Sequence, residues 1–286
     1  MPSVRQIRRR IRSVQNTAKI TKAMSMIAAS KMRRAQEAAI SGRPYADHMR
    51  DLLADLAAQP HDEEQIHLLL TQREVKNVEI VHITPDRGLT GGLNSNVNRA
   101  GSQFVLEQKA NVTVVAAGKK GGDFMVRYGA DVKAVFTGIG DRPTLLDITP
   151  IARIVIDDYM QEKVDAVYVV YADFVSTTVQ RPVVQSLLPV APAELPPQQA
   201  FGYIYEPDAA TVLSALLPRF VEMQLYHFML ESVASEQSAR MVAMRNATDN
   251  ANEMSDDLTL LMNKIRQENI TRELLDIVGG AAAVGG

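Results

Sequence analysis

The stretch VRQIRRRIRSVQNTAKITKAMSMIAASKMRRAQEAA, residues 4–39, sets the architecture of the N-terminal part of this chain. Its apolar and small residues recur at alternating spacings of three and four, which is the heptad spacing of a coiled coil. The seam positions are Val4, Ile7, Ile11, Val14, Ala18, Thr21, Ser25, Ala28, Met32, Ala35 and Ala39. Small seam residues let a partner helix approach closely, so the pattern predicts a long helix with a second helix packed against it.

A second run with the same spacing lies near the C-terminus and extends from Leu213 to Ile265. Asp208 is the predicted N-cap of this helix, because an aspartate side chain can accept a hydrogen bond from the first free backbone N–H groups. Gly279 with Gly280 predicts its end. Pro218 predicts a kink or an interruption near its first turns.

The middle of the chain alternates between strand-like and helix-like segments. Strands are predicted at 78–83, 111–118, 129–136, 165–174 and 177–190, and helices near 93–108, 119–129 and 144–162. Such alternation is typical of a mostly parallel sheet, and the short connection between the last two strands favours antiparallel pairing there. The predicted fold class is α/β: a Rossmann-like doubly wound α/β domain inserted between N- and C-terminal helices that form a long antiparallel coiled coil.

The expected boundaries follow from the change in pattern. The N-terminal coiled-coil helix covers residues 1–58 and the α/β domain covers 76–190. A proline-rich connector, residues 191–208, leads to the C-terminal coiled-coil helix at 209–286, and QPHDEEQ at 59–65 connects on the other side.

Charge is distributed unevenly along the chain. Residues 1–50 carry twelve lysines and arginines against Glu37 and Asp47, a formal net charge of +10, whereas the whole chain has a net charge of −2. The first fifty residues are therefore expected to meet something acidic: nucleic acid, a membrane surface, another protein, or the acidic half of this chain. No signal peptide and no membrane-spanning run are predicted, so we expect a soluble, cytoplasmic chain that can lie peripheral to a membrane.

Catalytic chemistry finds little support in the residues. The chain has no cysteine, which excludes thiolate ligands and cysteine nucleophiles, and its five histidines show no metal-ligand spacing. The glycine-rich turns at 84–96 and 116–123 lack both phosphate-loop patterns, so the favoured interpretation is ordinary strand-to-helix turns. We predict no catalytic residue, no metal site and no cofactor; a nucleotide-binding enzyme using the first turn is the alternative.

The basic helix has three interpretations. One is a nucleic-acid-binding coiled-coil adaptor, although Tyr45 is the only aromatic residue among the first fifty. Another pairs Arg8, Arg9 and Arg10 with acidic residues of the C-terminal helix. An acidic protein partner explains the surplus of methionine and alanine around residues 24–29 best, because only a sleeve around the helix pair could cover apolar faces outside the seam.

Two long segments resemble the signature regions of the F-type ATP synthase gamma chain family: RQIRRRIRSVQNTAKITKAMSMIAASKMRRAQ at 5–36 and SEQSARMVAMRNATDNA at 235–251. DRGLTGGLN at 86–94, YEPD at 205–208 and ELLDIVGGAAAV at 273–284 occur in the order that this family shows. Thr90 stands where the family often has cysteine.

The resemblance implies a non-catalytic central rotor shaft that couples proton-driven rotation to catalysis on other chains. The implied partners are three alpha and three beta chains, the epsilon chain and the c-ring, with no nucleic acid. The expected location is the cytoplasmic face of the bacterial cell membrane, as a peripheral protein in its CF(1) sector.

The resemblance also implies contact residues. The basic helix would meet acidic lever loops of beta, the glycine turn would make similar contacts, YEPD would face the c-ring, and the C-terminal helix would touch loops higher in the sleeve, with 274–284 as a tip in an apolar bearing. The residues are Lys22, Met24, Arg33, Arg34, Arg87, Thr90, Tyr205, Glu206, Asp208, Arg240, Arg266, Gln267, Thr271 and Glu273.

Overall fold

The computed structural model describes residues 3–58, 67–191 and 205–284. The chain divides into two compact units: residues 1–27 with 241–286, and residues 28–240. Both long helices, α1 (Val4–Ala58) and α5 (Ala209–Val284), contribute to both units. The predicted connector at 59–65, most of the one at 191–208, and the last two glycines lie outside the described residues.

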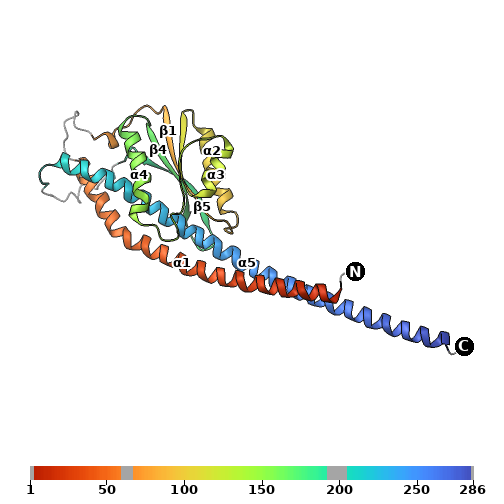
Figure 1. Cartoon of the computed structure of the whole chain (residues 1–286). Helices are drawn as coiled ribbons and strands as arrows, with labels where there is room; N and C mark the ends of the chain where they lie inside the picture. Colours follow the sequence, from red (N-terminus) through yellow and green to blue (C-terminus); the bar gives the residue numbers. More distant parts are fainter. Residues whose placement is uncertain (1–2, 59–66, 192–204, 285–286) are drawn as a thin grey trace. The chain divides into compact units, whose positions relative to one another are not determined.

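A five-stranded sheet lies at the centre of the larger unit (Figure 1). Its order is β3-β2-β1-β4-β5, with the first four strands parallel and β5 antiparallel to β4. The strands are β1 (Asn77–Ile83), β2 (Asn111–Ala117), β3 (Asp131–Phe136), β4 (Ala166–Phe174) and β5 (Gln180–Leu188). The predicted doubly wound sheet and its antiparallel last pair are confirmed.

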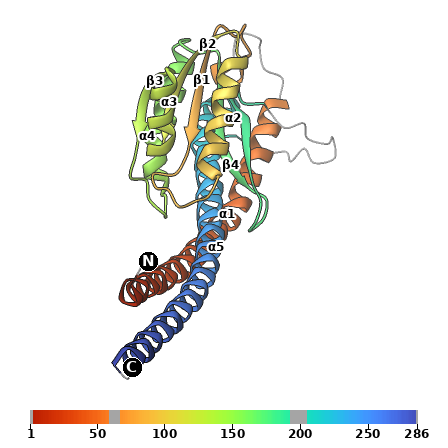
Figure 2. The ribbon, with the colours of Figure 1, turned by 90° about the vertical axis from the view of Figure 1, so that its right-hand side faces the viewer.

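Helices cover both faces of this sheet. They are α2 (Leu93–Glu107), α3 (Lys119–Tyr128) and α4 (Leu145–Met160), and a short 3-10 helix, η2 (Leu68–Leu70), precedes β1. Figure 1 shows α4 on one side of the strands with α2 and α3 on the other, and the turned view in Figure 2 brings α2 in front. Alternate strand residues explain this: Val81 and Ile83 pack with α4, whereas Val78 and Ile80 pack with α2.

The long helices complete the larger core. Apolar residues of α5 between Leu213 and Ala234 join the cluster under α4, together with Met49 and Leu53 of α1. This part of α5 is therefore covered on more than one side, which explains why its burial does not follow a simple stripe. A helix that packs against a sheet and a second helix at once has no single solvent face.

In the smaller unit the two helices pair antiparallel along the predicted seam. The hydroxyls of Thr21 and Thr248 share a hydrogen bond of 2.7 Å, and Ser25 Oγ donates to the carbonyl of Met241 at 3.1 Å. Farther along, Ile7 and Ile11 pack with Ile265 in a separate apolar cluster. Every predicted seam position from 4 to 39 is buried or half-buried, so the heptad pattern identified the contact face correctly.

The predicted interruption of α5 at Pro218 and its predicted end at Gly279 are wrong. The helix continues through Pro218, because the flanking Leu217 and Val221 are completely buried and their packing outweighs the lost backbone hydrogen bond. It also continues past Gly279 to Val284. Gly279 does not take the left-handed conformation that would end a helix, and a helical glycine costs only about 1 kcal/mol.

The predicted N-cap of α5 is confirmed. Oδ1 of Asp208 accepts a hydrogen bond from the backbone N–H of Thr211 at 2.8 Å, and Oδ2 accepts one from its hydroxyl. The backbone hydrogen bond from Thr211 is the main cause that lowers the pKa of Asp208.

A histidine is enclosed between β1 and the two helices on its side of the sheet. His82 is fully buried, and its Nε2 lies 2.9 Å from Oδ1 of Asn98. A Cβ on Gly101 or Gly121 would lie 2.8 or 2.6 Å from ring atoms, so glycine lets α2 and α3 approach this closely. Burial lowers the pKa of His82 from about 6.5 to about 4. Between pH 6.5 and about 4, His82 therefore stays neutral in the folded chain but is protonated in the unfolded chain.

This difference predicts a pH-dependent stability. Below pH 6.5 the unfolded state gains the proton on His82, so stability is lost as the pH falls toward 4, by about 2 kcal/mol between pH 8 and 5. Urea unfolding of the full chain, followed by tyrosine fluorescence, measures this loss, and His82→Gln should remove it. Burial raises the pKa of Glu79 and acts in the opposite direction, but both proteins retain Glu79, so its contribution cancels. Equal pH slopes for the two proteins would refute the assignment.

Candidate interaction surfaces of the long helices

The coiled coil of the smaller unit exposes a large amount of apolar surface outside its seam. Eleven large apolar side chains there are between 43% and 69% exposed. They are Ile20, Met26, Ile27, Met254, Leu260, Leu261, Ile270, Leu274, Leu275, Ile277 and Val278. Exposed apolar side chains in this number point to an interaction surface, and around Ile20, Met26 and Ile27 the partner helix has already taken the seam.

The last described turns of α5 have no covered face. Up to residue 279, where the described side chains of α5 end, Ile265 is the last buried residue, and every side chain from 266 to 279 is exposed. An isolated helix of this length is marginal in water. Packing against another molecule would therefore stabilise this segment.

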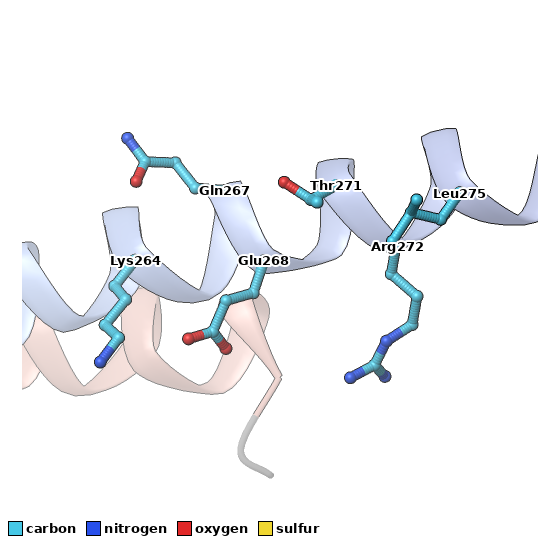
Figure 3. A pocket seen from close by; sticks show the side chains of 6 residues that line it. All are labelled: Lys264, Gln267, Glu268, Thr271, Arg272 and Leu275. Carbon is cyan, nitrogen blue, oxygen red and sulfur yellow. The ribbon is translucent and has the colours of Figure 1, made fainter.

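One side of this segment forms a shallow groove, drawn in Figure 3. Gln267 and Thr271 project to one edge, whereas Lys264, Glu268 and Arg272 project to the other with alternating charge. Their spacing of three and four places them on neighbouring rows of the helix. Two of the predicted contact residues, Gln267 and Thr271, therefore line this groove, and the other two of this region, Arg266 and Glu273, are exposed on the opposite face of the helix.

The basic part of α1 is available to a partner. Lys22, Arg33 and Arg34 are exposed, and Met24 is half-buried at the edge of the seam. Among the described residues none of the three cations forms an ion pair. The alternative that Arg8, Arg9 and Arg10 pair with acidic residues of the C-terminal helix is not seen in the described part of the chain either.

The glycine turn after β1 presents some of its residues and hides others. Arg87 is exposed, whereas the side chain of Thr90 is only 2% exposed. Leu89, which sequence reasoning did not select, is largely exposed and has a positive φ of 66°. The turn therefore offers Arg87 and Leu89 to a partner, and Thr90 stays a prediction that its burial does not favour.

The backbone donors that could hold a phosphate at the start of α3 are already in use. The N–H groups of Lys119 and Lys120 bind Asp86 Oδ1 at 2.8 Å and the carbonyl of Pro85 at 3.1 Å. The N–H of Gly121 donates to Thr84 Oγ1 at 2.7 Å, and the N–H of Gly122 donates to the carbonyl of Gly118 at 3.1 Å. Asp86 occupies the position that an anion takes at a helix N-terminus. Its place in the sequence PDRG is the signal that could have revealed this.

The remaining predicted contact residues differ in accessibility. The side chain of Arg240 is only 12% exposed, binds Glu236 at 2.6 Å and reaches the carbonyl of Gly88 at 3.3 Å. Tyr205 is half-buried and packs against the larger core, whereas Glu206 and Asp208 are exposed. Of these four, Glu206 and Asp208 are accessible to a partner at the start of α5.

Comparison with known proteins identifies the family. A family model described as ATP synthase matches residues 3–284. A protein of Dehalococcoides mccartyi described as ATP synthase gamma chain is 58% identical over 284 residues, covering 99% of this chain and 100% of its own length. This chain belongs to the ATP synthase gamma chain family. A gamma chain of Roseiflexus castenholzii is 52% identical over 287 residues, covering 99% of both chains.

Chains in solved structures of ATP synthase complexes share the fold. A chain from the central stalk and c-ring of the Tetrahymena thermophila mitochondrial ATP synthase is 26% identical with a TM-score of 0.60, covering 80% of this chain and 99% of its own. A chain from the Euglena gracilis mitochondrial ATP synthase has a TM-score of 0.68 at 18% identity, covering 98% and 94%. In the described part of this family member, no helix has both the length and the apolar character that crossing a bilayer requires.

Proposed function

We propose that this chain is the central rotor shaft of a proton-translocating F-type ATP synthase. It couples rotation of the c-ring to conformational changes at catalytic sites on the beta chains, for ATP synthesis or hydrolysis. The observation that carries this proposal is the exposed apolar surface of a coiled coil whose seam is already filled. A ring of three alpha and three beta chains would cover that surface.

The chain itself is non-catalytic in this proposal. The donors at the start of α3 are saturated by the chain's own oxygens, which leaves none of these four N–H groups for a nucleotide phosphate. Within the described residues no group of three or more acidic or histidine side chains could hold a metal ion. These observations argue against a phosphate site at the start of α3, and we assign nucleotide chemistry to the partner chains.

Asymmetry is the proposed source of the mechanism. A pair of helices has no threefold symmetry, so three identical beta chains would meet different faces of the shaft. Ile20 and Ile27, seven residues apart, present an apolar face, whereas Lys22 and Arg33 lie on a different, basic face. A conformational equilibrium shifts only through a difference in contact energy, and the shaft supplies this difference at each angle.

The shaft must also release each contact. Every 1.4 kcal/mol of angle-specific binding slows release about tenfold at a constant association rate. Methionine and small side chains give adaptable apolar contact, and lysine and arginine attract acidic loops over a longer range. The mixture in residues 23–34 suits a surface that binds at every angle without locking.

The partners are assigned by position. Lys22, Arg33 and Arg34 would meet acidic loops of beta, and Gln267 with Thr271 would meet loops farther along α5. Glu206 and Asp208 would lie at the c-ring end with the epsilon chain nearby. The coiled-coil segments 1–58 and 209–286, the α/β domain 76–190 and the connector 191–208 are the proposed functional parts. The complex would hold the chain peripherally at the cytoplasmic face of the bacterial cell membrane.

Cross-linking tests the proposal. The chain lacks cysteine, so a single Ile270→Cys variant can carry one photoreactive maleimide before it is assembled with alpha and beta chains. Ile270 is exposed in the segment that we assign to the sleeve. We expect light to join this residue to alpha or beta and to stop nearly all ATP hydrolysis, because a tethered shaft cannot turn.

The matched control joins the shaft only to itself. Thr21→Cys with Thr248→Cys replaces two hydroxyls that already touch, so oxidation should link the two helices of one chain. Hydrolysis should continue at the unlinked rate, because the linked pair still turns as one body. Undiminished hydrolysis in complexes fully cross-linked through Ile270→Cys would refute a rotating shaft.

A further inference from the structure

One carboxylate holds both long helices to the α/β domain. Asp141 lies in the loop between β3 and α4. Its Oδ2 is 2.5 Å from Nζ of Lys31 on α1, and its Oδ1 accepts a hydrogen bond from Nε2 of Gln237 on α5 at 2.8 Å. All three residues belong to the unit formed by residues 28–240.

The contact is partly enclosed. Gln237 is 1% exposed, and the side chains of Lys31 and Asp141 are 35% and 37% exposed. The amide of Gln237 would be unsatisfied without the carboxylate, because its burial removes it from water. Lys31 adds an ion pair to the same carboxylate, and a neutral acceptor at position 141 would not form this ion pair.

Neighbouring residues of α5 make similar polar contacts with the loops of the domain. Ser238 Oγ donates to the carbonyl of Thr177 at 2.7 Å, and Arg240 reaches the carbonyl of Gly88. By contrast, the contacts of α5 from Leu213 to Ala234 are largely apolar. Apolar surfaces are non-directional and tolerate sliding, whereas hydrogen bonds fix a helix in angle and register.

We propose that Asp141 is a positioning residue that fixes the angle of α1 and α5 on the α/β domain, so that torque applied to the domain passes into the coiled coil. This inference rests on the proposed rotor function. Both helices continue from this contact toward the seam residues Ser25 and Met241. If the domain turned relative to the helices at this contact, its rotation would not be transmitted to the part of the coiled coil that we place inside the alpha and beta chains.

The test uses the complete ATP synthase in membrane vesicles with Asp141→Asn and Asp141→Ala. Asparagine retains an acceptor for Gln237 but loses the charge that binds Lys31, whereas alanine loses both. We expect the ratio of proton pumping to ATP hydrolysis to fall in the order wild type, Asp141→Asn, Asp141→Ala. Asp123→Asn changes an exposed carboxylate of the same domain and should leave the ratio unchanged.

A mechanical measurement separates positioning from folding. The alpha and beta chains are fixed to a surface, and a probe on the α/β domain reports its angle while no ATP is hydrolysed. The angular fluctuation of the domain should rise by a factor of about two in Asp141→Ala, since a directional contact to each helix is lost. Exchanging the charges, with Lys31→Asp and Asp141→Lys, should restore only part of the stiffness, because the ion pair with α1 forms again but lysine cannot accept the hydrogen bond from Gln237 Nε2 on α5.

The outcomes are distinct. Wild-type stiffness and wild-type coupling in both assembled variants would overturn the role of Asp141. Absence of ATP-driven rotation of the domain in the wild-type complex would instead overturn the rotor function itself. If Asp141→Ala does not assemble, the isosteric Asp141→Asn still decides the matter, because it changes the charge and leaves the size of the side chain.

Discussion

Replacing Gly118 with alanine is expected to destabilise the α/β domain strongly. Gly118 has a φ of 117°, and a Cβ at this position would lie 1.7 Å from the backbone oxygen of Thr84. Its N–H also donates to the carbonyl of Phe136 at 2.7 Å, so the residue joins the ends of three strands. Relief of the clash would require separation of these strands. We expect a loss of more than about 4 kcal/mol, a large part of the stability of an ordinary domain.

Tyrosine fluorescence during urea unfolding measures this effect in the full chain. The chain has no tryptophan, and all eight tyrosines lie in the unit formed by residues 28–240. Gly129→Ala is the matched control: Gly129 has a φ of 83°, but no atom lies within 4 Å of its missing Cβ. This variant should lose only about 1–2 kcal/mol from backbone strain. Equal losses in the two variants would contradict the steric argument.

Replacing Ile7 with aspartate is expected to open the end of the coiled coil. Ile7 is completely buried against Ile11 and Ile265, in a cluster with few members. Loss of this packing and burial of a carboxylate should cost about 3 kcal/mol locally. Amide hydrogen exchange of residues 4–14 should then accelerate about a hundredfold, because local opening is that much more frequent.

An exposed isoleucine on the same helix provides the control. Ile20 is 61% exposed, so Ile20→Asp should change the exchange of the isolated chain very little. The same variant should weaken assembly with alpha and beta chains if this face lies in the sleeve. Faster exchange throughout α1 in Ile20→Asp would show that the heptad seam had been placed on the wrong face.

Most of the fold could be predicted from local patterns. Each predicted strand and helix of the domain overlaps its observed counterpart, and the seam of α1 was correct position by position, because heptad spacing and strand alternation report burial directly. The errors occurred at Pro218 and Gly279, where local propensity favoured a break. Propensity is a weak preference that tertiary packing overrides.

The candidate site was less predictable. The positions of the basic and apolar residues on the long helices could be deduced, because the seam defines which faces remain outside. The burial of Thr90 and Arg240 could not, because it depends on loops and helices that are distant in sequence. Leu89 was missed, since no local pattern distinguishes an exposed leucine in a turn from a buried one.

By itself the sequence determined that two long helices pair through a heptad seam and that a mostly parallel sheet lies between them, because periodicity is a property of neighbours along the chain. Only the tertiary structure decided that Asp86 occupies the anion position at the N-terminus of α3 and that Asp141 binds both helices. It also decided that Glu79 and His82 on one strand are buried with pKa shifts in opposite directions. Polar contacts, charge and solvation depend on residues brought together from distant segments, and no spacing along the sequence records those distances.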